Sequence, residues 1–178
     1  MLMDPNDDSH VKIANFGLAA FVSADRLLRS HTGSPGYVAP EILMKLPYGK
    51  EVDMWSIGVI CFVLLGGYPP FYDNSRNELY RKIKRGDYYF HPDYWGHVSS
   101  EAKDLIRKLL TVNPIERITG EKALKHPYLK LNGYSLSLNN ISQNLKRLKV
   151  FNAKRKFRAA ILTIMAISSL TRMIIEPQ

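Results

Sequence analysis

The amino-acid sequence predicts one mainly α-helical domain followed by a tail. Of its 178 residues, 46% are apolar and 11% aromatic, which is enough to build one packed core. An apolar run over residues 51–66 predicts a helix that is apolar almost all round beyond Met54, and such a helix must be buried. Further stretches combine a capping residue with apolar side chains at helical spacing, whereas one short stretch alternates as a strand does.

The first half of the chain is predicted to hold a strand, a loop and a helix. Residues 11–14 alternate weakly before a turn, as a short strand would. The stretch over residues 18–40 reads as a long functional loop, because it is interrupted at Gly33, Pro35, Gly36 and Pro40. The helix over residues 51–66 then ends at two glycines that precede two prolines.

Two amphipathic helices are predicted next. A cap at Asn74 or Ser75 and a stop at Gly86 predict a helix that runs to about residue 84. Ser99 can cap the following helix, which is marked by apolar side chains at Ala102, Leu105, Ile106, Leu109 and Leu110.

The last third of the chain contains a short helix, a linker and a tail. The short helix opens at Thr119 and stops before Pro127. Residues 131–144 are polar and rich in Ser and Asn, and we interpret them as a linker. From residue 145 to about residue 174 the sequence is first basic and then apolar, with helical spacing.

The formal net charge of +9 is concentrated in one segment. Between residues 144 and 158 there is no acid but there are seven cations, namely Lys146, Arg147, Lys149, Lys154, Arg155, Lys156 and Arg158. This pattern indicates a local basic arm rather than a nucleic-acid-binding surface. The single Cys61 lies in an apolar run, where a buried reduced thiol is expected. Together with an acidic N-terminus unlike a signal peptide, it predicts an intracellular, cytoplasmic protein.

Several motifs occur in a fixed order along the chain. They are Asn15-Phe16-Gly17, GSPGYVAPE at 33–41, DMWSIGV at 53–59, EAKDLIRKLL at 101–110, Asn113-Pro114, Arg117-Ile118 and ALKHP at 123–127. Together they resemble the C-terminal lobe of a protein kinase over nearly the whole chain, and most closely the calcium/calmodulin-dependent group. The resemblance implies a mainly α, kinase-like C-terminal lobe with a short strand remnant, followed by a regulatory helix.

The same resemblance suggests how the chain is divided. Residues 1–130 would form a partial protein kinase domain and residues 131–144 a linker. Residues 145–175 would form an autoinhibitory and calmodulin-binding segment, and residues 176–178 a short tail.

Asn15 stands where the family has the Asp of its Asp-Phe-Gly motif, which holds the Mg²⁺ that bridges the nucleotide phosphates. A neutral amide is a poor ligand for this hard cation, so a residual Mg²⁺ contact competes with a plain turn or capping role. Only fourteen residues precede Asn15, too few for the Gly-rich loop, the strand lysine, its glutamate partner and the His-Arg-Asp loop. We therefore expect no catalytic residue, weak or no binding of the family's ATP and Mg²⁺ by this chain alone, and a missing N-lobe.

The resemblance also assigns a substrate platform and a candidate phosphorylation site. The platform, which in the family receives the substrate residue next to the phosphorylated one, contains Ser34, Gly36 and Tyr37. It implies protein substrates or docking partners. Ser30 is the candidate phosphorylation site, since a phosphate would add about two negative charges near the loop arginines Arg26 and Arg29. The alternative is a merely solvated loop serine.

Three charged residues are assigned a structural role and not a catalytic one. Glu41 and Arg117 resemble the buried ion pair that ties the activation segment to the lower helices. Asp53 resembles the helix residue that hydrogen-bonds the catalytic-loop backbone. Charges tolerate burial only when they are paired.

The tail resembles the calmodulin-binding segment of the calcium/calmodulin-dependent kinases. The residues that would bind calmodulin are Lys154, Arg155, Lys156, Phe157, Arg158, Ile161, Ile164 and Leu170. On a helix the anchors Phe157, Ile161 and Ile164 lie within about 60° of one another, and Leu170 lies roughly 140° from Phe157, so two lobes of a clamp could share them. A basic amphipathic helix with spaced apolar anchors is the form in which calmodulin targets bind.

Two other interpretations of the tail remain open. The segment could lie on an anionic membrane surface, although its apolar run of nine residues is too short to span a bilayer. It could also pack on its own lobe, and this alternative is compatible with calmodulin binding, because in the family the segment blocks the kinase until calmodulin removes it. Asn144 stands where one branch carries a threonine that gives calcium-independent activity, so we do not expect that switch here.

Two functions follow from these features. The first is a partial calcium/calmodulin-dependent Ser/Thr protein kinase, inactive alone, with a calmodulin-binding regulatory segment. The alternative is a catalytically dead, pseudokinase-type protein-binding module with a calcium/calmodulin-controlled latch. Calmodulin and protein substrates or docking partners are the expected partners, whereas nucleic acid and membrane are not.

Overall fold

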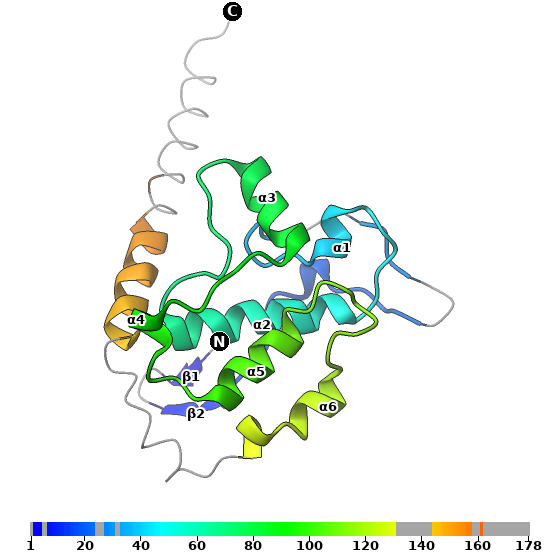
Figure 1. The fold of residues 1–178 in the computed structure, drawn as a ribbon. Helices are drawn as coiled ribbons and strands as arrows, with labels where there is room; N and C mark the ends of the chain where they lie inside the picture. Colours follow the sequence, from blue (N-terminus) through cyan, green and yellow to red (C-terminus); the bar gives the residue numbers. More distant parts are fainter. Residues whose placement is uncertain are drawn as a thin grey trace, which may run out of the picture.

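The structure is a computed structural model that describes residues 2–4, 7–23, 27–30, 33–130, 144–157 and 161. Within these residues the protein is mainly α-helical, as the sequence predicts (Figure 1). The elements are β1 (Leu2–Asp4), β2 (Asp7–Val11), η1 (Phe16–Leu18), α1 (Pro40–Leu43), α2 (Glu51–Gly66), α3 (Arg76–Arg85), α4 (Pro92–Trp95), α5 (Ser100–Leu109), α6 (Gly120–Leu124) and η2 (Pro127–Lys130). A further helix covers residues 144–157 and is orange in Figure 1. The predicted linker, except Asn144, lies outside the described residues.

The strand predicted over residues 11–14 is wrong in position. The β2 strand ends at Val11, where it pairs with Leu2 of the antiparallel strand β1. Residues 12–15 belong to no strand, and the Ile13 side chain is 84% exposed. A strand needs a neighbour to satisfy its backbone N–H and C=O groups, and within the described residues β1 begins at Leu2, the partner of Val11.

The core forms where α2 packs against α5 and α4. Trp55, Val59 and Phe62 on one side of α2 are at most 1% exposed. At Gly58 a Cβ atom would lie 2.8 Å from the Cβ of Leu109, so the close approach of α2 and α5 requires a residue without a side chain. The helix ends at Gly66, and the next residue, Gly67, has a φ of 78°, the left-handed conformation typical of a helix stop.

The other side of α2 does not have the complete burial that its sequence predicts. Ile57, Ile60 and Leu64 are 43%, 46% and 51% exposed, and their spacing places them on one stripe of the helix. Asp53 continues the stripe toward the N-terminus of α2 and is also exposed. Beyond Met54 the helix is apolar almost all round, but its described packing partners α5 and α4 approach it at Gly58 and Gly66, on the buried side. We call residues 53, 57, 60 and 64 the α2 stripe.

Three of the helices begin at the predicted caps. The side chains of Ser75, Ser99 and Thr119 each accept a hydrogen bond from a backbone N–H three residues later, at 3.5, 3.2 and 3.3 Å. The sequence does not indicate α1, α4 or η2, because each is a single turn of four residues and too short to show a period. All three of these short helices begin with a proline, a residue suited to a first turn.

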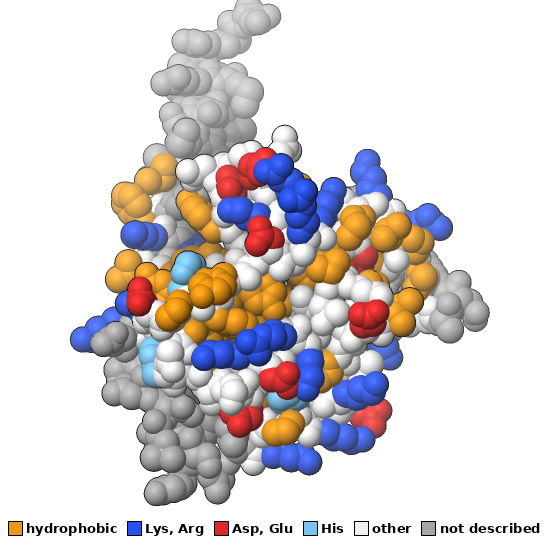
Figure 2. Space-filling view, in the orientation of Figure 1, with side chains coloured by type: hydrophobic (Ala, Val, Ile, Leu, Met, Phe, Trp, Pro, Cys, Tyr) orange, Lys and Arg blue, Asp and Glu red, His pale blue; other side chains and the backbone are white. Residues whose placement is uncertain are grey.

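Aromatic side chains fill the space between α2 and α4. The ring of Phe62 has its centroid 5.2 Å from that of Tyr68, 5.5 Å from that of Phe90 and 4.7 Å from that of Trp95. Trp95 Nε1 donates to the Tyr68 hydroxyl oxygen at 3.0 Å, and burial raises the pKa of Tyr68. Figure 2 shows hydrophobic side chains as a band across this face, between α3 and α5.

A buried ion pair joins α1 to the loop between α5 and α6. Arg117 Nη1 and Nη2 donate to Glu41 Oε1 and Oε2 at 2.7 and 2.9 Å, and both side chains are almost completely buried. The guanidinium also donates to the backbone oxygens of Thr111, Glu51 and Val112 at 2.9, 2.7 and 3.2 Å. All its N–H directions are therefore engaged, which is the condition for burying an arginine.

Glu41→Gln should lower the free energy of unfolding by about 3–5 kcal/mol, because it leaves a buried guanidinium without its counter-charge. Urea unfolding followed by circular dichroism measures the change. The matched control is Glu121→Gln, which breaks an exposed pair with Lys125 and should cost about 0.5 kcal/mol or less. A loss below about 1 kcal/mol for Glu41→Gln would contradict the structural role of the pair.

The α2 stripe should make the isolated chain self-associate, because apolar side chains on one face favour burial against another surface. Replacing both Ile60 and Leu64 by Gln should shift the mass measured by light scattering toward the monomer and leave folding intact. Val59→Gln is the matched control, since it places an amide on the buried side of the same helix and should unfold the protein. A wild-type chain that is monomeric at every concentration would count against this expectation.

Candidate functional site

A cavity of about 540 Å³ lies between the loop that precedes α1 and the N-terminal half of α2. Its wall includes Ser34 and Tyr37 from the loop, Asp53 and Ser56 from α2, and residues 18–22 from the extended N-terminal segment. Two of the three predicted platform residues therefore share one concave surface with Asp53.

Hydrogen bonds fix the platform loop to α2. The Tyr37 N–H donates to Ser34 O at 2.9 Å and closes a turn, and Ser56 Oγ donates to Tyr37 O at 3.0 Å. Gly33, just before this turn, has a φ of 150°, which residues with a side chain rarely adopt. A Cβ built at Gly36 would meet no atom within 4 Å, so the tip of the turn borders open space. The loop thus presents an accessible turn anchored to a buried helix.

Asn15 lies apart from this turn in an exposed, extended segment. It adopts a left-handed conformation with φ 66° and ψ 70° immediately before η1, and its side chain makes no capping hydrogen bond. Asn and Asp tolerate this conformation better than most residues do, which accounts for an asparagine here. The side chain of Phe16 is 67% exposed.

The residues around Asn15 do not fit a bound Mg²⁺ ion. Magnesium prefers charged oxygen ligands, and Asn15 offers a neutral amide. Within the described ranges no group of three or more His, Cys, Asp or Glu side chains could hold a metal. Asp53 lies on the first turn of α2, where an acid suits the positive end of the helix dipole. Its backbone N–H donates to Lys50 O at 3.2 Å, and its carboxylate makes no hydrogen bond or ion pair with the described residues.

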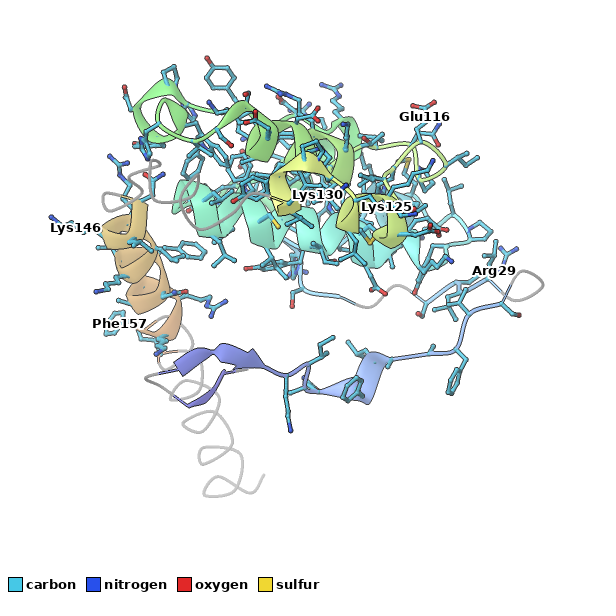
Figure 3. All side chains as sticks on the ribbon, turned by 90° about the horizontal axis from the view of Figure 1, so that it is seen from below. Arg29, Glu116, Lys125, Lys130, Lys146 and Phe157 are labelled. Atoms are coloured by element: carbon cyan, nitrogen blue, oxygen red, sulfur yellow. The ribbon has the colours of Figure 1, made fainter. Side chains whose placement is uncertain are left out.

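Ser30 is linked to Tyr48 across an isolated bridge. Leu28 and Tyr48 exchange two backbone hydrogen bonds, at 2.9 and 3.0 Å. The Tyr48 hydroxyl donates to Ser30 O at 2.9 Å, and Ser30 Oγ lies 2.6 Å from the same hydroxyl and can donate to it. Ser30 is nevertheless exposed, and Arg26 lies outside the described residues. Arg29, next to Ser30 in the sequence, is exposed as well (Figure 3).

The helix over residues 144–157 is attached to the lobe at its N-terminal end. Asn144 is fully buried and hydrogen-bonds the backbone oxygens of Leu65 and Tyr94. Leu148 and Phe151 pack against the main core. The N-terminal half of the helix, up to Phe151, is therefore attached to the lobe.

The C-terminal half of this helix faces solvent. The cations Lys154, Arg155 and Lys156 are exposed, and Phe157 is 70% exposed. Figure 3 shows Lys146 and Phe157 near the two ends of the helix, with both side chains directed away from the lobe. Ile161 is helical and 40% exposed. The remaining predicted calmodulin contacts, Arg158, Ile164 and Leu170, lie outside the described residues.

Two further observations bear on the sequence predictions. Among the described residues no helix is both long enough and apolar enough to cross a membrane. Burial raises the pKa of the Cys61 thiol, so the protonated form is favoured and the thiol is a poor nucleophile.

The contacts of the Asn144 side chain could not be found from the sequence. His97 Nε2 lies 3.1 Å from Asn144 Nδ2, and Arg147 Nη1 donates to Asn144 Oδ1 at 3.2 Å. The guanidinium of Arg147 also lies 4.0 Å from the centroid of the Tyr94 ring. The only signal in the sequence is the spacing of Asn144 and Arg147, which puts them on adjacent turns of one helix face.

Comparison with known proteins identifies the family. The family described as "Protein kinase domain" matches residues 1–129. The calcium/calmodulin-dependent protein kinase type II subunit delta of Oryctolagus cuniculus is 47% identical over 166 residues, which are 93% of this chain and 31% of that protein. The chain thus spans about a third of the length of this relative. It belongs to the protein kinase family, within the calcium/calmodulin-dependent protein kinases.

Proposed function

We propose that this chain is a partial calcium/calmodulin-dependent Ser/Thr protein kinase, inactive by itself, with a tail that binds calmodulin. The observation that carries the proposal is the exposed C-terminal half of the helix over residues 144–157. There three consecutive cations precede an exposed aromatic side chain, Phe157. Calmodulin binds basic amphipathic helices by enclosing their apolar anchors in its grooves. This half of the helix presents both the cations and an apolar anchor to a partner.

The division of the chain follows the same proposal. Residues 1–130 are the partial kinase domain, 131–144 the linker, 145–175 the regulatory segment and 176–178 a tail. The last linker residue, Asn144, is also the first residue of the helix over residues 144–157. The buried Asn144 marks the point where the regulatory helix joins the lobe. A calmodulin partner implies an intracellular, cytoplasmic protein, and the half-buried Cys61 thiol, whose pKa is raised by burial, agrees with this.

The turn at residues 34–37 is accessible, which supports the proposal that the platform binds protein substrates or docking partners. Its Ser34 and Tyr37 border the cavity beside α2, and Gly36 borders open space. Phosphorylation of Ser30 would modify the hydroxyl that now hydrogen-bonds the Tyr48 hydroxyl. The added negative charge would lie next to Arg29 in the chain. The proposed platform and the proposed phosphorylation site would thus both belong to the loop before α1.

A second candidate function is a catalytically dead protein-binding module. Two observations favour it: Asn15 offers a neutral amide in place of a metal-binding carboxylate, and the α2 stripe offers an apolar surface to a partner. In that case calmodulin would control access to a docking surface rather than an enzymatic activity. Restoration of phosphotransfer on adding a Gly-rich loop, strand lysine and His-Arg-Asp loop upstream would favour the kinase over this module.

The chain of 178 residues should bind Mg²⁺-ATP weakly or not at all and should transfer no phosphate. It contains no Gly-rich phosphate loop or His-Arg-Asp loop, and Asn15 is a poor Mg²⁺ ligand. Titration calorimetry with Mg²⁺-ATP and a radiolabel assay on a Ser/Thr peptide measure both properties. Asn15→Asp is the matched variant, and it should restore neither Mg²⁺-ATP binding nor phosphate transfer. Phosphotransfer that Asn15→Ala abolishes would overturn the proposal of an inactive chain.

A peptide of residues 144–171 should bind calmodulin in calcium and release it on chelation, because only the calcium-loaded sensor opens its Met-rich grooves. Phe157→Ala should weaken binding by about 2 kcal/mol, roughly thirtyfold, because it removes a buried aromatic anchor. Titration calorimetry measures both effects. The matched control is Val150→Ala, an exposed apolar position of the same helix that is not an anchor. Binding that is equally strong without calcium and with Ala at 157 would contradict the calmodulin site.

A further inference from the structure

The helix α3 carries a cluster of positive charge that the proposed function does not use. Its ten residues include one acid, Glu78, and five cations, namely Arg76, Arg81, Lys82, Lys84 and Arg85. Outside α3 and the basic segment at residues 144–158, the sequence has thirteen Lys or Arg and fifteen Asp or Glu, a formal net charge of −2. The positive charge of α3 is therefore a local feature and not part of a generally basic chain.

The apolar face of α3 is buried, and its cations are directed outward. Ile83 is 0% exposed, and Leu79 and Tyr80 pack against the main core. Residues 77, 80, 81 and 84 have the spacing of one stripe along the helix. Together with residue 85 they line a groove of about 340 Å³, and Figure 2 shows Lys and Arg side chains gathered over α3. We call this the α3 groove, and its residues are Asn77, Tyr80, Arg81, Lys84 and Arg85.

Ion pairs with the rest of the lobe neutralise only part of this charge. Glu78 forms an exposed ion pair with Arg81, and Lys82 forms one with Asp73 at 3.1 Å. Exposed pairs of this kind are weak and are screened by salt. Three further exposed cations have no ion pair with the described residues, namely Arg76, Lys84 and Arg85.

The stability of α3 does not explain the clustering. Arg76 is the first residue of the helix, where the helix dipole favours an acid. Arg81 and Arg85 are four residues apart, a spacing at which like charges destabilise a helix. Only the last-turn position of Lys84 and Arg85 suits the dipole. A binding partner of opposite charge accounts for the cluster better than helix stability does.

The side chains that line the α3 groove are suited to binding carboxylates. All of them carry hydrogen-bond donors, and none of them is a carboxylate. Arginine can bind a carboxylate through two parallel hydrogen bonds. Residues 77 and 84 lie about 10 Å apart along the helix axis. In an extended peptide, alternate side chains lie on the same side about 7 Å apart, so two acids at alternate positions fit within this length.

The size of the groove favours a short protein segment over nucleic acid or a lipid surface. The whole of α3 is only about 15 Å long, and the net negative charge of the chain around it would repel a polyanion that extends further. A helix that binds a membrane surface needs exposed apolar side chains, whereas Leu79 and Ile83 of α3 pack on the core. A short acidic segment needs only the groove.

The α3 helix is also a neighbour of the proposed platform. It contacts α1, which directly follows the loop that contains Ser34, Gly36 and Tyr37 (Figure 1). A protein that approaches the lobe on this side can therefore reach α3.

We propose that the α3 groove binds an acidic segment of a partner protein, one with Asp or Glu at alternate positions. Arg81, Lys84 and Arg85 hold its carboxylates. The inference goes beyond the proposed function and requires neither calmodulin nor phosphate transfer, so its test bears on it alone.

The test titrates the full chain into a fluorescein-labelled peptide of about twelve residues, with Glu at alternate positions and Ser between them, in about 0.15 M NaCl. Fluorescence anisotropy measures binding. Replacing every Glu of the peptide by Gln should weaken binding about tenfold or more, because the charge pairs are lost. Arg81→Gln combined with Lys84→Gln in the chain should have a similar effect. The matched control, Lys122→Gln combined with Lys125→Gln, removes two exposed cations at α6 and should change the affinity less than about twofold.

Two further variants separate lost binding from lost structure. Lys84→Gln combined with Arg85→Gln leaves the pair of Glu78 and Arg81 intact and should also weaken binding about tenfold. Lys84→Arg combined with Arg85→Lys keeps both charges and should retain the affinity within about threefold. Circular dichroism should give the same helix content for all of them, because the replaced side chains are exposed.

The proposal would be overturned if the Glu peptide did not bind, or if it bound no better than the Gln peptide. It would also fail if both α3 double variants bound as the wild type does. A loss of binding confined to Lys154→Gln combined with Arg155→Gln would assign the acidic peptide to residues 144–158 instead. Tighter binding of a labelled single-stranded DNA of similar length, lost in the α3 variants, would show that the groove binds nucleic acid rather than protein.

Discussion

The pair of Glu41 and Arg117 is the constraint on which the rest of the lobe depends. Arg117 reaches from the loop between α5 and α6 to α1, to the first residue of α2 and to the end of α5, and its guanidinium lies 5.2 Å from the centroid of the Trp55 ring. A charge buried this deeply is stable only while all these partners are in place. The pair therefore fixes α1 on the core, and the platform loop that precedes α1 is held near α2.

The helix over residues 144–157 is attached to the lobe by a different kind of interaction. The lobe is held by apolar packing around α2, whereas the helix over residues 144–157 starts at a single buried amide and buries only part of one face. An element held by few contacts opens more easily than the core does. The proposed function requires this difference, since the helix would have to leave the lobe while the lobe stays folded. The basic C-terminal half of the helix would attract an acidic partner.

Local patterns explain why much of the fold could be predicted. The helix over residues 51–66 follows from its apolar run, and three helix starts follow from Ser75, Ser99 and Thr119. The predictions failed where a distant partner decides the outcome. The strand near Val11 was misplaced because its position depends on β1, and the α2 stripe is exposed because packing, not composition, selects the buried side. The contacts of Asn144 join residues up to 79 positions apart, which no local pattern records.

The central claim is that a folded kinase-type lobe carries a helix that responds to calmodulin. Amide hydrogen exchange of the full chain, before and after adding calcium-loaded calmodulin, tests it most directly. We expect new protection over residues 152–171 and no change in α2 or α5, whose amides belong to the core. An unchanged tail, or calmodulin-dependent changes confined to α2, would contradict the claim.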